Sequence, residues 1–245
     1  MVVLSLLAES AEPLSVARIS DATGIARASL GRLLASLQAD DAVRVDEAGR
    51  YRPTLSVLRP AMALLALLRV RDVGFPHLVE LSRTVGYEVF LGLYEYPEIV
   101  FVESVFSLDG NVTSRLMYQT KPLLTSHTGR LLVALQPEAV QRQPWTEQIE
   151  QLDLDEPTRR ELGEEMRRSR LDGFIYFDRT DEGSPSGLAV AILGSSELPV
   201  ASITITRPRE LDSVFLDEVL PRAQDAARRI SAALGSRQVT QVAHL

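Results

Sequence analysis

The sequence predicts an α+β protein with a small helical unit followed by a larger unit built on a mainly antiparallel sheet. Three observations support this prediction. Residues 1–40 hold three segments with helical apolar periodicity, residues 42–52 have the pattern of a short hairpin, and after residue 74 strand-like apolar runs alternate with amphipathic segments. We expect the boundaries of these parts at 1–56, 57–73 for a linker helix, 74–236 for the larger unit and 237–245 for a tail.

The first two helices are short. Residues 3–7 place their leucines and valine on one helical face, and the helix ends before Pro13. Ser15 directly precedes the next periodic stretch, where a serine typically caps a helix by accepting a hydrogen bond from a backbone N–H. Gly24 ends that second helix and supplies the turn into the next one.

A third helix is predicted from Ala26 to Gln38. Its apolar stripe is formed by Leu30, Leu33, Leu34 and Leu37. The opposite face is small or hydrogen-bonding and consists of Ala28, Ser29, Arg32 and Ala35, with Arg27 and Gly31 at its edges. No acid occurs from residue 26 to residue 39, which favours a helix that lies in a DNA major groove. We favour this interpretation over an ordinary solvated helix face, which usually carries Glu and Lys.

The hairpin that follows completes a winged helix-turn-helix. Residues 42–45 and 50–52 are strand-like, and Asp46 to Gly49 form a glycine-containing turn between them. Arg44, Arg50 and Arg52 are therefore expected to contact phosphates beside the third helix. The predicted DNA-binding residues are Ser15, Arg27, Ala28, Ser29, Arg32, Arg44, Arg50 and Arg52.

The next segment, Thr54 to Val73, is strongly apolar and contains Met62 and four leucines between residues 64 and 68. A helix of this composition needs a partner. One interpretation is that it pairs two subunits, which suits the two-fold half-sites of helix-turn-helix proteins. The other is that it packs on the second unit of its own chain. We favour the first interpretation and expect a homodimer or a dimer of dimers.

The larger unit is expected to contain two pairs of strands and at least two flanking helices. The predicted elements are a helix over 75–85, strands over 88–94 and 99–105 joined by a turn at 96–98, strands over 188–193 and 200–206, and a closing helix over 211–234.

These motifs carry a family resemblance. Residues 9–54, with a Pro-Leu-Ser entry, a helix closing on Gly, a Ser-x-x-Arg-Leu-Leu helix and a Gly-Arg-Tyr wing strand, resemble the DNA-binding domain of the IclR family of bacterial regulators. The segments 121–130, 173–178 and the last strand pair resemble its effector-binding domain. The resemblance implies a GAF-like α/β domain with a curved antiparallel sheet, in which a helix start and neighbouring strands surround a ligand.

The resemblance also implies which residues face the effector. They are His127, Thr128, Asp178, Gly187, Ala189, Thr204 and Thr206. Met117 is an eighth candidate, as part of the wall described below. A helix start offers free N–H groups, and nearby hydroxyls can orient a carboxylate, so the expected effector is a small organic acid. Thr204 and Thr206 share one face of their strand, although alternating threonine is also an ordinary strand composition.

The sequence departs from the family pattern at Gly31, His127, Arg179, Ser184 and Gly187. His127 replaces a small residue, which narrows the pocket and adds a hydrogen-bond donor. Gly187 stands where members often have Cys. An effector larger than the small acids of the family fits these changes, with a wall supplied by Phe90, Tyr94, Met117 and Tyr118.

Composition excludes several classes of function. The chain has no cysteine, which rules out disulfides and thiolate metal sites, and its three histidines lie far apart, so neither a metal nor a cofactor is expected. The longest apolar run, residues 61–68, is too short to cross a bilayer, and we expect no membrane partner and a cytoplasmic protein. The net charge is −7, but residues 1–60 are neutral.

An enzyme is the competing hypothesis. Ser126, His127 and Asp178 contain the atoms of a hydrolase triad, but no Gly-x-Ser-x-Gly elbow surrounds the serine. We therefore expect no catalysis. The sequence predicts a regulator that binds double-stranded operator DNA and a small-molecule effector.

Overall fold

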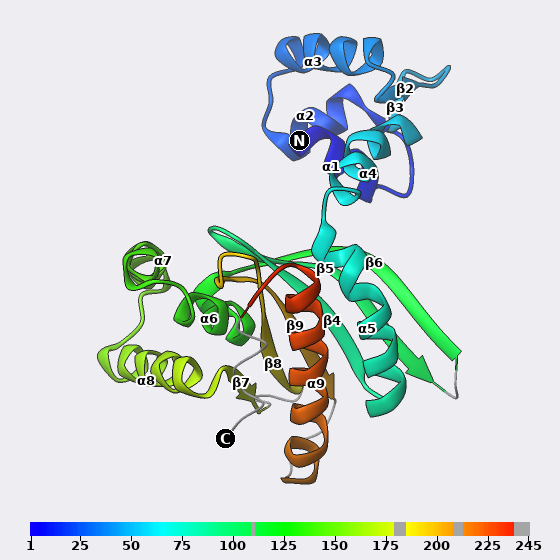
Figure 1. Cartoon of the computed structure of the whole chain (residues 1–245). Coiled ribbons are helices and arrows are strands. Elements are labelled where there is room, and N and C mark those ends of the chain that lie inside the picture. The colour runs from blue at the N-terminus through cyan, green and yellow to red at the C-terminus, as the bar shows by residue number, and fades with distance from the viewer. Residues whose placement is uncertain (109–110, 179–184, 208–212, 238–245) are drawn as a thin grey trace. The chain divides into compact units, whose positions relative to one another are not determined.

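The computed structural model describes residues 1–108, 111–178, 185–207 and 213–237 (Figure 1). Arg179, Ser184 and most of the predicted tail lie outside these ranges. The chain forms two compact units, Met1–Leu68 and Arg69–Leu245. Their boundary falls within the segment that the sequence assigns to a linker.

The N-terminal unit contains the expected helices. Its elements are α1 (Val2–Glu9), β1 (Leu14–Ser15), α2 (Val16–Thr23), α3 (Arg27–Ala39), β2 (Val43–Val45), β3 (Arg50–Pro53), the 3₁₀ helix η1 (Leu55–Val57) and α4 (Leu58–Leu65). Ser15 caps α2 by accepting a hydrogen bond from the Arg18 backbone N–H at 3.4 Å, and Gly24 ends it with φ of 70°. Ile19, Leu30 and Leu34 are fully buried between the helices.

The hairpin forms as the sequence predicts. Strands β2 and β3 pair antiparallel, and β1 pairs with the other edge of β3. The carboxylate of Asp46 accepts hydrogen bonds from the N–H groups of Ala48 at 3.0 Å and Arg50 at 2.8 Å, while Gly49 adopts φ of 71°. These hydrogen bonds lower the pKa of Asp46.

The apolar segment after the hairpin forms two helices instead of the single helix expected over 57–73. α4 ends in a tight turn, because the N–H groups of Leu67 and Leu68 bond the carbonyls three residues earlier, at 3.0 and 3.1 Å. A new helix, α5 (Arg69–Val85), then starts the second unit and includes the helix expected over 75–85. Met62 and Leu64 of α4 remain more than half exposed.

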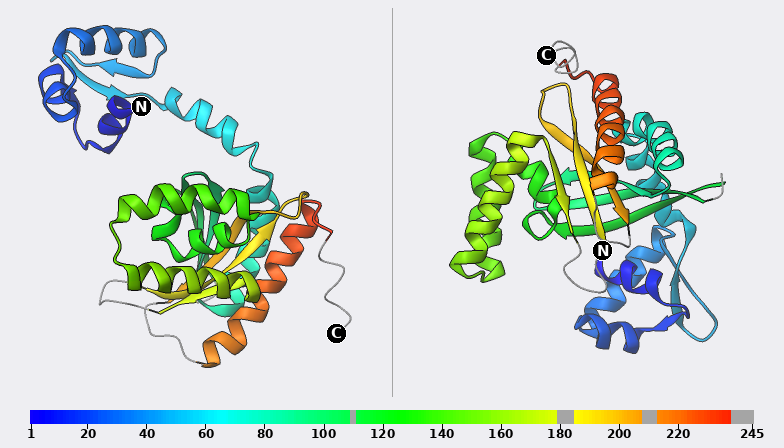
Figure 2. Two further views of the ribbon diagram at one scale, coloured as in Figure 1. Left: turned by 90° about the vertical axis from the view of Figure 1, so that its left-hand side faces the viewer. Right: turned by 90° about the horizontal axis from the view of Figure 1, so that it is seen from below.

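The C-terminal unit has three layers (Figure 2). Its elements after α5 are β4 (Glu88–Glu95), β5 (Glu98–Leu108), β6 (Asn111–Pro122), the 3₁₀ helix η2 (Leu123–Thr125), α6 (His127–Ala134), α7 (Glu138–Leu152), α8 (Glu156–Asp172), β7 (Phe174–Phe177), β8 (Ser186–Leu193), β9 (Pro199–Arg207) and α9 (Ser213–Ala233). The strands form one antiparallel sheet in the order β6-β5-β4-β9-β8-β7. Helices α5 and α9 cover one face, and α6, α7 and α8 cover part of the other.

Each face of the sheet has its own core. Leu91, Ile203 and Ile230 are fully buried between the sheet, α5 and α9. Leu123 and Leu132 are fully buried on the opposite side, beneath α6, α7 and α8. Both expected strand pairs and the closing helix are present. Strand β6 was not predicted, because most of its side chains are exposed and its sequence lacks apolar alternation.

The start of α6 approaches the backbone of η2 very closely. A Cβ added at Gly129 would lie 2.3 Å from the carbonyl oxygen and 2.8 Å from the Cα of Leu123. Only glycine fits at this place, because the atoms that a side chain would meet belong to the main chain. Gly129 therefore fixes how the first turn of α6 packs on η2.

We expect Gly129→Ala to lower the free energy of unfolding by about 1–3 kcal/mol, the usual cost of an overpacked core. Gly163→Ala in α8 is the matched control, since its Cβ would have an ordinary contact of 3.6 Å with Trp145. The control should stabilise by roughly 0.5–1 kcal/mol, because alanine favours a helix over glycine. Urea unfolding of both variants tests the difference, and a Gly129→Ala protein as stable as the parent would contradict it.

Candidate functional site

A cavity of about 1000 Å³ lies on the face of the sheet that carries α6. Its polar lining consists of Glu88, Gln119, Lys121, Thr125, Ser126, His127, Thr128, Asp178, Thr204, Thr206 and Arg207. Its aromatic lining consists of Tyr87, Phe90, Phe101, Phe106 and Phe177. The cavity is thus large enough for an organic molecule with an aromatic or extended carbon skeleton.

Two buried threonines join α6 to the sheet at this cavity. Thr128 is 2% exposed and Thr204 is 3% exposed, and their hydroxyl oxygens lie 3.0 Å apart. Ser126 caps α6 by accepting a hydrogen bond from the Gly129 N–H at 3.4 Å. The first turn of α6 therefore forms one wall of the cavity, with its N–H groups at the positive end of the helix dipole.

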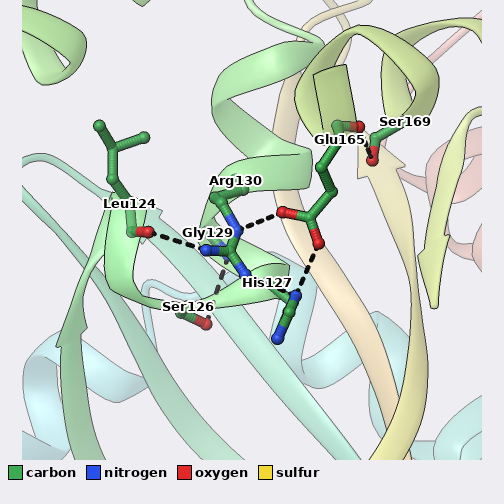
Figure 3. Close-up of polar contacts among 7 residues, drawn as sticks. All are labelled: Leu124, Ser126, His127, Gly129, Arg130, Glu165 and Ser169. Carbon is green, nitrogen blue, oxygen red and sulfur yellow. Dashed lines mark hydrogen bonds and ion pairs between the residues drawn. The ribbon is translucent and has the colours of Figure 1, made fainter. Parts of the chain in front are cut away.

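His127 and Arg130 of α6 share one carboxylate, Glu165 of α8 (Figure 3). Glu165 Oε1 lies 2.9 Å from His127 Nδ1, and Glu165 Oε2 lies 2.6 Å from Arg130 Nε. Arg130 also reaches His127 Nδ1 with Nη2 at 2.5 Å and donates from Nη1 to the carbonyl of Leu124 at 3.3 Å. Burial lowers the pKa of Arg130, and the Glu165 carboxylate opposes this shift.

The imidazole of His127 is also held by an aromatic stack. Its ring centroid lies 4.8 Å from that of Phe177, and the two planes are inclined by only 8°. Phe177 ends β7 and pairs with Gly187 of β8. The ring of His127 is therefore fixed both in its plane, by the contacts of Nδ1, and on one face, by Phe177.

The cavity contains charges of both signs. Arg207 is 8% exposed and packs over the rings of Tyr87 and Phe215, with its guanidinium carbon 6.0 and 5.2 Å from their centroids. Lys121, at the end of β6, is exposed. The acids are Glu88, bonded to the Ser104 hydroxyl, and Asp178, which accepts from the Ser186 hydroxyl at 2.7 Å. The cations can thus contact an anionic group of a ligand, and the acids can accept hydrogen bonds from donors of the same ligand.

The structure places five of the eight predicted effector residues on the cavity wall: His127, Thr128, Asp178, Thr204 and Thr206. The other three do not line it. Met117 packs against the core beneath α6, and Ala189 is buried beside Leu131. A Cβ at Gly187 would lie 2.3 Å from the carbonyl oxygen of Ile205, so this glycine serves close packing. Of the wall expected for a larger effector, Phe90 lines the cavity and Tyr118 is 81% exposed.

The sequence prediction does not include Glu165 among the site residues. A signal for its position exists, because α8 buries Leu162, Met166 and Ser169. Glu165 lies three residues after Leu162 and four before Ser169, so it borders the buried face of α8. Lys121 and Arg207 were also missed as lining residues, since they lie at strand ends.

The hydrolase alternative is wrong for this site. Ser126 Oγ caps the Gly129 N–H, His127 Nδ1 faces Glu165, and Asp178 accepts from Ser186. Among the described residues, no hydrogen bond connects Ser126 with His127 or His127 with Asp178. The relay from base to nucleophile that a triad requires is therefore absent from this part of the chain.

In the N-terminal unit, the predicted DNA-contacting side chains of α3 are exposed. They are Arg27, Ala28, Ser29 and Arg32. Leu33, assigned to the apolar stripe, is 39% exposed, while Leu30 and Leu34 are buried. Arg44, Arg50 and Arg52 are exposed on the hairpin, and Arg50 Nε contacts Asp46 Oδ2 at 2.8 Å. Ser15 is half-buried with its hydroxyl engaged in capping α2.

A winged helix-turn-helix on the same chain as an α/β unit with a large polar and aromatic cavity defines a DNA-binding transcription regulator with a ligand-binding domain. Residues 1–47 match the IclR helix-turn-helix domain, and residues 62–232 match the C-terminal domain of the bacterial transcriptional regulator IclR. The chain therefore belongs to the IclR family of bacterial transcriptional regulators. The proteins of this family are regulators and not enzymes.

Individual relatives agree with this assignment. The glycerol operon regulatory protein of Streptomyces coelicolor is 26% identical over 95% of this chain and 93% of its own length. The crystal structure of Thermotoga maritima IclR superposes with a TM-score of 0.72 at 21% identity, covering 95% of this chain and 96% of that one. An IclR homologue from Microbacterium hydrocarbonoxydans, crystallised with 4-hydroxybenzoate, has a TM-score of 0.73 at 17% identity, with 95% and 96% covered.

Within the described ranges, none of the helices has the length and apolar character needed to span a membrane.

Removing the shared carboxylate should destabilise the C-terminal unit. In Glu165→Ala, the guanidinium of Arg130, whose side chain is 14% exposed, loses its ion pair. We expect a loss of about 1–3 kcal/mol in the free energy of unfolding, below the figure for a fully buried pair because Glu165 is 29% exposed. Glu164→Ala, one residue away and exposed, is the control and should change stability by less than about 0.5 kcal/mol. Equal denaturation midpoints in urea for the two variants would show that the pair has no structural role.

Proposed function

We propose that this chain binds operator DNA as a homodimer, or as a dimer of dimers, and that a small carboxylic acid in the cavity of the C-terminal unit changes its operator affinity. The observation that carries the proposal is the cavity formed by the first turn of α6, two hydroxyl-bearing residues of β9 and two cationic side chains. It lies on the same chain as a winged helix-turn-helix.

The third helix is the part of the N-terminal unit that we assign to the major groove. Its exposed face combines short side chains at Ala28 and Ser29 with Arg32, so the backbone can approach the bases while the guanidinium reaches a base edge or a phosphate. Arg44 and Arg52 extend from the hairpin toward solvent and suit phosphate contacts. Arg50 contacts Asp46 at 2.8 Å, closer than the 3.8 Å between Arg44 and Asp41, so we rank Arg50 below the other two.

Dimerisation is supported by the exposed apolar side chains of α4 and its flanks. Leu55, Leu58, Met62, Leu64 and Leu67 are each 51% exposed or more. A helix with this surface is unfavourable alone in water, and a second copy would remove it from solvent. Two copies would also present two recognition helices to half-sites about one helical turn, or roughly 34 Å, apart.

A carboxylic acid suits the cavity chemistry. The positive end of the α6 dipole, the buried guanidinium of Arg207 and the ammonium of Lys121 each favour an anionic oxygen. Phe90 and Phe101 offer ring faces to the carbon skeleton of the ligand. A structural relative from Microbacterium hydrocarbonoxydans is described in complex with 4-hydroxybenzoate, an acid of this kind.

The effector can change operator affinity only through a difference in its own affinity for two arrangements of the protein. We infer that these arrangements differ in how the two units of the chain are placed and that the segment from α4 to α5 transmits the change. The same free-energy coupling must act in reverse, so operator DNA alters effector affinity by the same factor.

Replacing Arg32 tests the groove assignment. The operator is first obtained by selecting bound duplexes from a random pool. We expect Arg32→Ala to weaken binding to the selected operator by roughly 10- to 100-fold, the usual cost of a lost base contact, with circular dichroism unchanged. Arg83→Ala, on the exposed surface of α5, serves as the control and should leave affinity as it is. An Arg32→Ala protein that binds like the parent would remove α3 from the groove.

A thermal-shift panel of carboxylic acids tests the cavity. An acid present at 100 times its Kd should stabilise the protein by about 2.7 kcal/mol. Thr204→Ala should weaken that acid several-fold, since a lost hydrogen bond corresponds to about 1 kcal/mol. Thr84→Ala, at an exposed position of α5 outside this cavity, is the control. A stabilising acid that is unaffected by both Thr204→Ala and Asp178→Ala must bind elsewhere.

A further inference from the structure

His127 presents a single free polar atom to the cavity. Its Nδ1 is engaged by Glu165 at 2.9 Å and Arg130 at 2.5 Å, and one face of its ring is covered by Phe177. Among the described residues, Nε2 makes no hydrogen bond, and it points away from Glu165 and Arg130 (Figure 3). Because His127 lines the cavity, Nε2 is available to a ligand in a fixed orientation.

The two partners of Nδ1 favour opposite tautomers of the imidazole. Glu165 as a carboxylate can only accept a hydrogen bond, so it favours a proton on Nδ1 and leaves Nε2 as an acceptor. The guanidinium of Arg130 can only donate, so it favours a proton on Nε2 and makes that atom a donor. The neutral ring can satisfy one partner at a time, and both tautomers keep the same ring position.

A hydroxyl is the ligand group that complements both tautomers, because it donates to an acceptor and accepts from a donor. A carboxylate or ketone oxygen only accepts, and a methyl or ring C–H provides no hydrogen bond at all. If Nε2 faced an apolar part of a ligand beside Phe177, it would lose its hydrogen bond to water and gain no other, which costs binding free energy. The site therefore discriminates against effectors that lack a polar group at this point.

The geometry points to His127 as the specificity-determining residue of the cavity, selecting a hydroxylated carboxylic acid whose hydroxyl bonds Nε2. This inference rests on the proposed function, which supplies the carboxylic acid. The carboxylate and the hydroxyl are bound by different groups. Lys121 and Arg207 are obligate cations, while His127 recognises the hydroxyl of the same ligand. Glu165 is a positioning residue that acts through His127.

Matched pairs of acids that differ by one hydroxyl test this inference. The probes are 4-hydroxybenzoate with benzoate, 4-hydroxyphenylacetate with phenylacetate, lactate with propionate, and malate with succinate. Their Kd values are measured by isothermal titration calorimetry on the full chain. In at least one pair we expect the hydroxylated acid to bind roughly tenfold tighter or more. In His127→Phe the ratio for that pair should fall below about twofold, while binding of the acid without the hydroxyl persists.

Phenylalanine keeps a ring to stack on Phe177 and leaves the Glu165–Arg130 ion pair in place, so the variant should fold. The control is His77→Phe, which makes the same substitution in α5 outside this cavity and should keep the parent's ratio. Acids that bind without a hydroxyl preference, or a preference that survives in His127→Phe, would overturn this inference alone. If no acid of the panel binds, the proposed effector class fails and this inference falls with it.

Discussion

The close approach of α6 to the backbone of Leu123 is the constraint on which the cavity depends. Because position 129 has no side chain, the first turn of α6 can lie directly on η2. This packing brings Thr128 within 3.0 Å of Thr204 on β9 and turns Arg130 toward the carbonyl of Leu124. One main-chain contact, between Gly129 and Leu123, therefore places both His127 and the first turn of α6 beside the hydroxyl of Thr204.

The buried charge of Arg130 connects α6 to α8. Arg130 cannot be left unpaired in the interior, and Glu165 of α8 compensates it at 2.6 Å. The same principle operates on the other face of the sheet. There Glu103 of β5 is 1% exposed and is held by Nε and Nη2 of Arg71, at 3.0 and 2.8 Å. Arg71 lies in the first turn of α5, so an ion pair anchors the helix that begins the C-terminal unit to the central sheet.

Features encoded by neighbouring residues could be predicted from the sequence. The Ser15 cap, the Gly24 turn and the hairpin over 43–53 depend on residues a few positions apart, and the structure contains all three. Strand β6 could not be predicted, because its mostly exposed side chains leave no apolar period. The contact of Glu165 with His127 spans 38 residues and depends on how α8 packs, which no local pattern encodes. The end of α4 before Arg69 likewise has no Gly or Pro to mark it.

Gly187 and His127, where the sequence is expected to depart from the family pattern, are physically connected. Phe177 pairs with Gly187 across β7 and β8, and a Cβ at Gly187 would lie 2.8 Å from the tip of the Phe177 ring. Gly187 thus leaves room for the ring of Phe177, and this ring offers a flat face at the cavity wall. His127 stacks on that surface at 4.8 Å. A side chain at position 187 would meet the carbonyl oxygen of Ile205 at 2.3 Å and the Phe177 ring at 2.8 Å, so it would disturb the support of His127. The absence of a side chain at one position therefore permits the imidazole at the other.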